Sequence, residues 1–269
     1  PFSSMDALDL ARIPDPSRMR PGQRRLAAGA RHLTPLAPGS ALWQEKKQVL
    51  DAGASRLAVP GFDASAAVTA ILAQARTEGL AAAEPIELAF EEDFAVLDGA
   101  TTALPWLCVC VPSHWAPEAK LGHPFAAVHA RVADNQMLLA AGRQLVQLVT
   151  GGDRFERFVW TVTPSARHDQ HPRRHARTPW PDTPDPAASA EARTLRAERQ
   201  PFFPVRDRPG QAVFTIRVML QPLAQAVRGK DEAGRLHDAL ASMSEAVLAY
   251  KGLAPARDRL LAWLAERAS

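Results

Sequence analysis

The chain has 269 residues, of which 46% are hydrophobic and 23% charged, and its net charge is only +3. These proportions are typical of a soluble globular protein and exclude a largely disordered or fibrous chain. No apolar stretch is long enough to span a membrane, and the small net charge does not favour a nucleic-acid partner. Residues 1–25 carry charges and prolines instead of a signal-peptide core, so we expect a cytoplasmic protein.

The first part of the chain predicts an arm, a helix and several strands. Residues 1–60 are expected to form an extended N-terminal arm, because their first forty residues are rich in Pro, Arg and Gly. A helix follows, with Asp63 or Ser65 as its cap and Gly79 at its end. Short apolar runs then predict strands at residues 86–90, 94–97 and 104–111, after a shorter one within the arm at residues 31–36.

The second part predicts a helix at residues 136–149 and strands at residues 154–164 and 211–220. Residues 165–192 are expected to form a basic, proline-rich loop. Residues 231–269 are expected to form the C-terminal helices, one around residues 236–248 and one at residues 255–267. Together these elements predict one α+β domain over residues 1–269, with a mainly antiparallel sheet of five or six short strands and peripheral helices.

The chain has two cysteines, Cys108 and Cys110, in one apolar run. A disulfide between such close neighbours would be strained, so we expect packed thiols. Two cysteines cannot hold a four-thiolate iron–sulfur cluster. Any such cluster must lie on another chain.

Three histidines in the loop, His168, His171 and His175, have a spacing that allows a metal site. A proline follows His171 and arginines surround the group, so a solvated basic loop is the favoured interpretation. Ser113 and His114 are adjacent, but no nucleophile-elbow motif surrounds them. A turn or helix cap is the favoured role for Ser113.

The triplet of Glu198, Arg199 and Gln200 precedes an aromatic pair and is either a charged cluster at a pocket rim or the end of a surface segment. The surface interpretation is favoured, because Glu and Arg are mostly exposed. Arg217 interrupts an apolar strand, and a half-buried arginine requires an anionic partner, either Glu198 or a ligand carboxylate.

Two histidines lie six positions apart in the run LGHPFAAVHARVADN. His123 stands between Gly122 and Pro124, which predicts a turn. His129 lies among apolar residues, where a hydrogen-bonded core histidine is more common than a metal ligand. The residues alone do not distinguish these roles.

Four runs in order, EEDFAVL, VCVPSHWAPEAKLGHPFAAVHARV, LRAERQPFFPVRDRPGQAVFTIRVMLQPL and YKGL, resemble the haem-dependent oxidative N-demethylase family. The resemblance covers most of the chain from about Ile86 onward. It implies a PAS-like fold, in which a five-stranded antiparallel sheet holds haem b against one face. By the same resemblance, His129 matches the histidine that ligates the iron, and His123 receives no role.

The resemblance also implies the activity of a haem-dependent monooxygenase. A small N-methylated amine would be oxidised with O2 to a carbinolamine that releases formaldehyde. Glu198 would hold an ammonium group or relay a proton, Arg217 would contact a haem propionate or the distal ligands, and Arg199 would help to bind the cofactor. Electrons would come from a separate reductase with FMN and a 2Fe-2S cluster that uses NAD(P)H, in agreement with the cysteine count.

The chain departs from the family pattern at Pro201, Phe202 and Val218, so we expect a reshaped site. Its reaction would then be with an amine bulkier than dimethylamine, or a different haem oxidation. Tyr250 is the only tyrosine, and distal tyrosine chemistry requires that it reach the pocket. The alternative functions are a non-catalytic haem-PAS gas or redox sensor, or a haem-binding subunit. The chain carries no evident output domain, which counts against the sensor.

Overall fold

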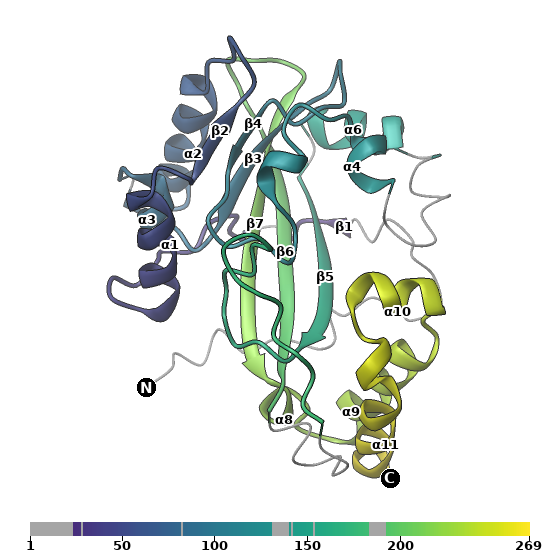
Figure 1. Ribbon diagram of the computed structural model, residues 1–269. Helices are drawn as coiled ribbons and strands as arrows, with labels where there is room; N and C mark the ends of the chain where they lie inside the picture. The colour runs from purple at the N-terminus through teal and green to yellow at the C-terminus, as the bar shows by residue number, and fades with distance from the viewer. Residues whose placement is uncertain are drawn as a thin grey trace.

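An open antiparallel sheet forms the centre of the protein in the computed structural model, which describes residues 24–27, 29–81, 83–130, 140, 142–152, 154–182 and 192–269 (Figure 1). Within these residues the sheet has seven strands in the order β1-β5-β6-β7-β3-β4-β2. Their bounds are Arg24–Arg25 (β1), Arg56–Ala58 (β2), Asp93–Asp98 (β3), Trp106–Cys108 (β4), Phe155–Thr163 (β5), Thr194–Pro204 (β6) and Gln211–Pro222 (β7). The α+β class is confirmed, whereas a PAS-like sheet of five strands is not.

The helices lie around the sheet, with α1, α2 and α3 at one end and α9, α10 and α11 at the other (Figure 1). Their bounds are Ala41–Asp51 (α1), Ser65–Thr77 (α2), Ile86–Ala89 (α3), Phe125–His129 (α4), Gly142–Thr150 (α6), Leu223–Ala226 (α8), Lys230–Ala241 (α9), Glu245–Lys251 (α10) and Arg257–Ala268 (α11), with 3-10 turns at Pro117–Ala119 (η2) and Ala254–Ala256 (η3). No helix among the described residues is long and apolar enough to cross a membrane.

Successive side chains of a strand point to opposite faces of a sheet. On one face, Trp160 and Leu195 form a single buried cluster with residues of α9 and α11, and Phe94 packs with residues of α2. On the other face, Phe155 and Phe202 pack against α6. The sheet is therefore covered on both faces at several places, which explains why its strands contain few exposed residues.

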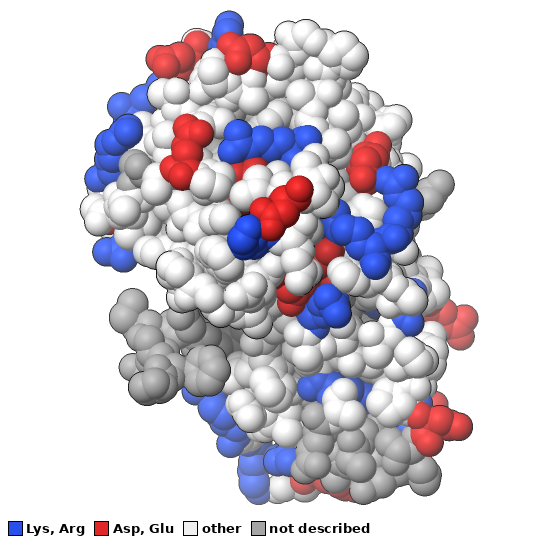
Figure 2. Space-filling view, turned by 60° about the vertical axis from the view of Figure 1, so that its left-hand side comes forward, with Lys and Arg blue, Asp and Glu red and all other residues white. Residues whose placement is uncertain are grey.

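Charged side chains of both signs lie close to one another at several places on the face seen in Figure 2. Lys47 and Asp51, one turn apart on α1, form such a surface pair, with 2.7 Å between their charged atoms. This mixed distribution agrees with the small net charge of +3.

Several predicted elements are confirmed. Residues 94–97 lie in β3, and the strands predicted at residues 154–164 and 211–220 correspond to β5 and β7. The predicted helix after residue 62 corresponds to α2, but its N-cap is Ala64 and not Asp63 or Ser65; the Asp63 carboxylate accepts a hydrogen bond from the Ser65 N–H at 2.9 Å. Cys108 and Cys110 are free and buried, as expected for packed thiols.

The strand predicted at residues 86–90 is wrong, because residues 86–89 form the short helix α3. A short apolar run does not distinguish a strand from a buried helical turn by its periodicity. Tertiary contacts decide here: the buried Glu87 accepts a hydrogen bond from Arg56 at 2.7 Å, which holds the turn against β2.

The region predicted as an arm contains regular structure. Residues 41–51 form α1, whose first turn is capped by Ser40 Oγ, and residues 56–58 form β2. The strand expected at residues 31–36 is reduced to an isolated bridge at Pro35. Strand β6 was not predicted either, because its polar residues mask the strand pattern.

Two predicted helices of the second half of the chain differ from the structure or lie partly outside the described residues. The long helix expected around residues 236–248 is divided into α9 and α10 by a break at residues 242–244. The helix expected at residues 136–149 is described only from Gly142, as α6, apart from residue 140. Most of its predicted first turns lie outside the described residues.

A buried lysine connects α1 to the sheet. Lys46 has no exposed surface, and its ammonium donates hydrogen bonds to the carbonyls of Phe90 at 3.1 Å and Glu92 at 2.7 Å. It also forms an ion pair with the buried Asp93 at 3.1 Å. Burial by itself lowers the pKa of Lys46, but the Asp93 carboxylate outweighs this effect and raises it. The lysine therefore remains charged inside the protein.

Replacement Lys46→Met is expected to lower the free energy of unfolding by about 3–5 kcal/mol, because it leaves Asp93 as an unpaired buried charge. Chemical denaturation measures this loss. The matched control is Lys47→Met, which removes an exposed pair and should change stability by less than about 1 kcal/mol. Equal effects of the two substitutions would contradict the role assigned to Lys46.

A second buried group, Glu92, predicts how stability depends on pH. Burial raises the pKa of its carboxyl to about 7, although the Thr34 N–H donates to it at 2.9 Å. Between the ordinary pKa of 4.5 and about 7, the folded protein therefore holds a proton that the unfolded chain releases. The contribution of Glu92 to stability is present below this window and is lost as the pH rises through it.

Replacement Glu92→Gln imitates the protonated carboxyl, so it should flatten the decline in stability from about pH 5 to about pH 8. At the upper end of this range the variant should be more stable than the wild type by about 1–3 kcal/mol. Urea unfolding across the same range measures the slope. The exposed Glu266→Gln provides the control, and an unchanged slope in Glu92→Gln would contradict the assignment.

Candidate functional site

The pairing of three central strands places Glu198 on a defined face of the sheet. Glu198 lies opposite Val159 of β5 and Val218 of β7, and Gln200 lies opposite Arg157 of β5. Since side chains directly opposite one another share a face, these five residues are on the same side of the sheet. We call this side the Glu198 face.

Arg199 and Arg217 lie on the other side. They are directly opposite each other in β6 and β7, and neither pairs with Glu198. Arg199 Nε is 2.8 Å from Glu156, and Arg217 Nε is 2.7 Å from Glu91. The structure therefore does not bring these arginines together with Glu198, and Arg217 finds its acidic partner in Glu91.

The Glu198 carboxylate is held at both oxygens. Ser113 Oγ donates a hydrogen bond to Oε1, and Gln200 Nε2 donates to Oε2 at 2.6 Å. Arg196, which is buried in the same strand, donates through Nε to Ser113 Oγ at 2.6 Å. The favoured interpretation of Glu198 to Gln200 as a surface segment was wrong, since Glu198 is half-buried and Gln200 is buried.

Three half-buried cations lie near this carboxylate: Lys120, Arg157 and Lys251. Burial lowers the pKa of Lys120 and of Lys251 to about 8, and the negative charge of Glu198 opposes this change. Burial also lowers the pKa of Arg157, again against the effect of Glu198. Among the described carboxylates, only Glu198 opposes the lowering of the pKa by burial at all three cations.

His129 ends α4 beside these cations. Its Nδ1 is 2.8 Å from the Phe125 carbonyl, and its ring stacks on that of Phe125 with centroids 4.1 Å apart. Burial, with the charges of Arg157 and Lys120, lowers the imidazole pKa to about 4, against the effect of the hydrogen bond to Phe125. The ring is therefore neutral near pH 7. With Nδ1–H donating to the carbonyl, the lone pair lies on Nε2, the tautomer used by metal-ligating histidines.

His123 has a different environment. Its N–H donates to the Lys120 carbonyl at 3.1 Å, and its side chain is exposed. This agrees with the turn predicted between Gly122 and Pro124. The structure thus places the two histidines in different environments, with His123 exposed in a turn and His129 half-buried at the end of α4.

Helix α10 brings two further groups to the same region. Lys251 Nζ donates to the Trp160 carbonyl at 2.6 Å, which holds the end of α10 against β5. Tyr250 is 51% exposed, and its pKa is raised by burial and by the charge of Glu198. The only tyrosine in the chain is therefore close enough to Glu198 to interact with it electrostatically.

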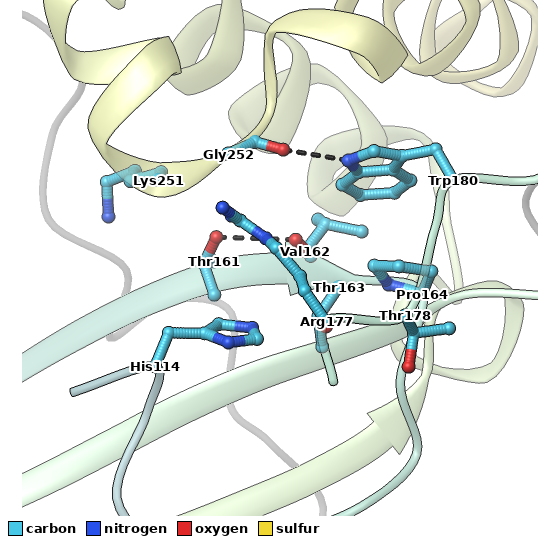
Figure 3. A pocket seen from close by; sticks show the side chains of 10 residues that line it. All are labelled: His114, Thr161, Val162, Thr163, Pro164, Arg177, Thr178, Trp180, Lys251 and Gly252. Carbon is cyan, nitrogen blue, oxygen red and sulfur yellow. Dashed lines mark hydrogen bonds between the residues drawn. The ribbon is translucent and has the colours of Figure 1, made fainter. Parts of the chain in front are cut away.

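A small pocket adjoins this cluster on the Glu198 face (Figure 3). Thr161, opposite Arg196 in the sheet, forms part of its lining together with His114, Arg177 and Lys251. Gly252 has a positive φ of 68°, and a Cβ at this position would collide with the guanidinium of Arg177. The glycine is therefore required both for the turn and for the position of Arg177.

The side chains of the three histidines of the proline-rich loop contact three different acidic residues. The pairs are His168 and Glu45, His171 and Glu118, and His175 and Asp169. Among the described residues, no cluster of three or more His, Cys, Asp or Glu side chains could hold a metal ion. The expectation of a wholly solvated loop was also wrong, since His171 is buried. Residues 183–191 of this loop lie outside the described residues.

Comparison with known families identifies the chain. Residues 67–261 match the family described as haem-dependent oxidative N-demethylase, alpha subunit-like. The chain belongs to this family. No curated protein matches the chain significantly.

The name of the haem-dependent oxidative N-demethylase alpha subunit-like family indicates an oxidative enzyme that depends on haem. The donor set fits this cofactor in two respects. His129 has the tautomer of an iron ligand, and the nearby Lys120, Arg157 and Lys251 are suited to the two carboxylates of haem b. All these residues lie within the range matched by the family.

The sequence did not indicate several of the residues that lie around Glu198. Arg157 interrupts the strand-forming run RFERFVWTV as Arg217 interrupts its own strand, so the same signal was present in β5. Lys120 and Lys251 carry no comparable signal, because their loop and helix meet the sheet only in the folded chain. A turn or helix cap was the favoured role for Ser113, and its contact with Glu198 was not foreseen.

Proposed function

We propose that this protein is a haem-dependent monooxygenase that oxidises the methyl group of a small N-methylated amine and releases formaldehyde. The observation that carries the proposal is the position of a neutral imidazole, His129, near cations that also surround the fixed Glu198 carboxylate. Membership of a haem-dependent oxidative N-demethylase-like family supports the reaction class.

His129 would bind the iron of haem b through Nε2, while Nδ1–H keeps its hydrogen bond to Phe125. This second contact fixes the tautomer and the orientation of the ring. Haem supplies the activation of O2 when it is bound. In the balanced reaction, one N-methylated amine, one O2, a pair of electrons and a pair of protons give the demethylated amine, formaldehyde and water.

Glu198 would hold the ammonium form of the amine and accept its N–H proton. Ser113 and Gln200 fix the carboxylate, so little reorganisation is needed when the amine binds. Val218 lies directly opposite Glu198, but it is buried and presents almost no surface to a bound amine.

Arg199 and Arg217 receive no catalytic role in this proposal. Their contacts with Glu156 and Glu91 stabilise the opposite face of the sheet. The electron pair would come from a separate reductase with FMN and a 2Fe-2S cluster that uses NAD(P)H. Cys108 and Cys110 are too few to bind a four-thiolate cluster.

Replacement His129→Ala tests the iron ligand. The purified wild type, reconstituted with haemin, should show a Soret band that the variant loses or shifts, because the axial nitrogen is gone. His123→Ala is the matched control from the same segment and should leave the band unchanged. A wild type that does not take up haemin would overturn the proposed function, and an unchanged spectrum in His129→Ala would overturn the choice of ligand.

Replacement Glu198→Gln keeps the size of the side chain but removes its charge. Formaldehyde release from N-methylated amines should fall about 10²- to 10⁴-fold, the usual contribution of a positioned proton acceptor. Haem absorbance should remain, because Glu198 is not the proposed ligand. Formaldehyde is measured with reduced protein, O2 and a series of methylamines, with the exposed Glu266→Gln as control.

The same assay separates the enzyme from the alternative of a gas sensor. Wild-type protein that binds O2 stably and releases no formaldehyde from any amine would contradict the catalytic proposal. It would then favour a sensor.

A further inference from the structure

The Glu198 face carries more positive than negative charge. Glu198 is the one carboxylate that acts electrostatically on the three described cations Lys120, Arg157 and Lys251. Both of its oxygens already accept hydrogen bonds, from Ser113 and from Gln200. Among the described residues, the Arg157 guanidinium has no ion pair or hydrogen bond. Lys120 is held over the Trp115 ring at 4.0 Å, and Lys251 donates to a main-chain carbonyl. Neither of these contacts supplies a negative charge.

Three other half-buried arginines, unlike Arg157, are each paired with a carboxylate. Arg174, Arg199 and Arg217 each have a carboxylate oxygen 2.7–2.8 Å from Nε. Arginine keeps its charge when it is removed from water, so an unpaired guanidinium in such a position is costly. The absence of a partner for Arg157 within the described part of the chain therefore indicates a ligand anion.

We propose that Arg157, together with Lys120 and Lys251, forms a carboxylate-binding site beside His129 on the Glu198 face. The planar guanidinium of Arg157 would bind a carboxylate bidentately, and the two ammonium groups would add charge. These groups come from β5, from the turn after η2 and from the end of α10, so the site exists only in the folded chain.

This inference rests on the proposed function, because haem b provides the nearest source of carboxylates in its two propionates. The second source is an amine substrate that carries its own carboxylate, such as an N-methylated amino acid. Both sources present the same chemistry to Arg157. They differ in which molecule loses affinity when the guanidinium is removed.

The test compares wild type with Arg157→Gln in two titrations of the apoprotein, one with haemin and one with haemin dimethyl ester, whose propionates are blocked. If the site holds a propionate, the variant should bind haemin about 10- to 100-fold more weakly, as expected for a lost charge-assisted contact. Its affinity for the ester should equal that of the wild type. The exposed Arg76→Gln is the control.

If the site holds a substrate carboxylate, haemin and ester should bind to the variant as to the wild type. The spectral shift caused by N-methylglycine should then be lost, while that caused by dimethylamine remains. A variant that matches the wild type for haemin, for the ester and for both amines would overturn the proposal.

A measurement without haem keeps the two proposals separable. Succinate should raise the thermal midpoint of the wild-type apoprotein and should not raise that of Arg157→Gln. A wild type that binds no haemin but shows this difference would overturn the proposed function and support the carboxylate site. If neither haemin nor succinate has any effect on the wild type, both proposals fail.

The stability of the variants provides a check on folding. Removal of an unpaired cation should leave the apoprotein at least as stable as the wild type, whereas Arg199→Gln should destabilise it by breaking a pair. If Arg157→Gln does not fold, Arg157 is structural and the proposal is wrong for this residue. Lys251→Gln then tests the remaining cations by the same titrations, and unchanged haemin and N-methylglycine binding would overturn the site as a whole.

Discussion

The alternation of side chains along β6 is the constraint on which the site depends. This strand is paired on both sides, with β5 and with β7, so its residues cannot rotate away from the faces that the register gives them. Glu198 and Arg199 are neighbours in the sequence and therefore lie on opposite sides of the sheet. A shift of the register by one residue would exchange them and dismantle both charge networks.

The charged side chains on the two faces of the sheet have different partners. On one, Arg199 and Arg217 are neutralised by Glu156 and Glu91, and the charges contribute to the structure of the sheet. On the other, several cations surround one carboxylate that is already hydrogen-bonded at both oxygens. Unneutralised positive charge in a partly buried region favours the binding of an anionic ligand, since the ligand can supply the missing negative charge.

Segments distant in the sequence complete the site around this strand. Ser113 follows β4 and reaches Glu198 because the buried Arg196 donates to its hydroxyl. Helix α10 reaches β5 because Lys251 donates to the Trp160 carbonyl. The break between α9 and α10, which the sequence pattern did not reveal, allows α9 to pack in the core while α10 turns to the sheet. The break between α9 and α10 therefore helps to determine where Lys251 lies relative to β5.

The sequence by itself determined the α+β class, the strands with clear apolar alternation such as β3, β5 and β7, and, through its motifs, the haem-dependent family. It also singled out His129 and Glu198. Only the tertiary structure decided that Arg217 pairs with Glu91, and that Arg157, Lys120 and Lys251 lie near Glu198. The physical reason is that periodicity reports burial along one element, whereas the partner of a charge depends on strand register and on loops that meet only after folding.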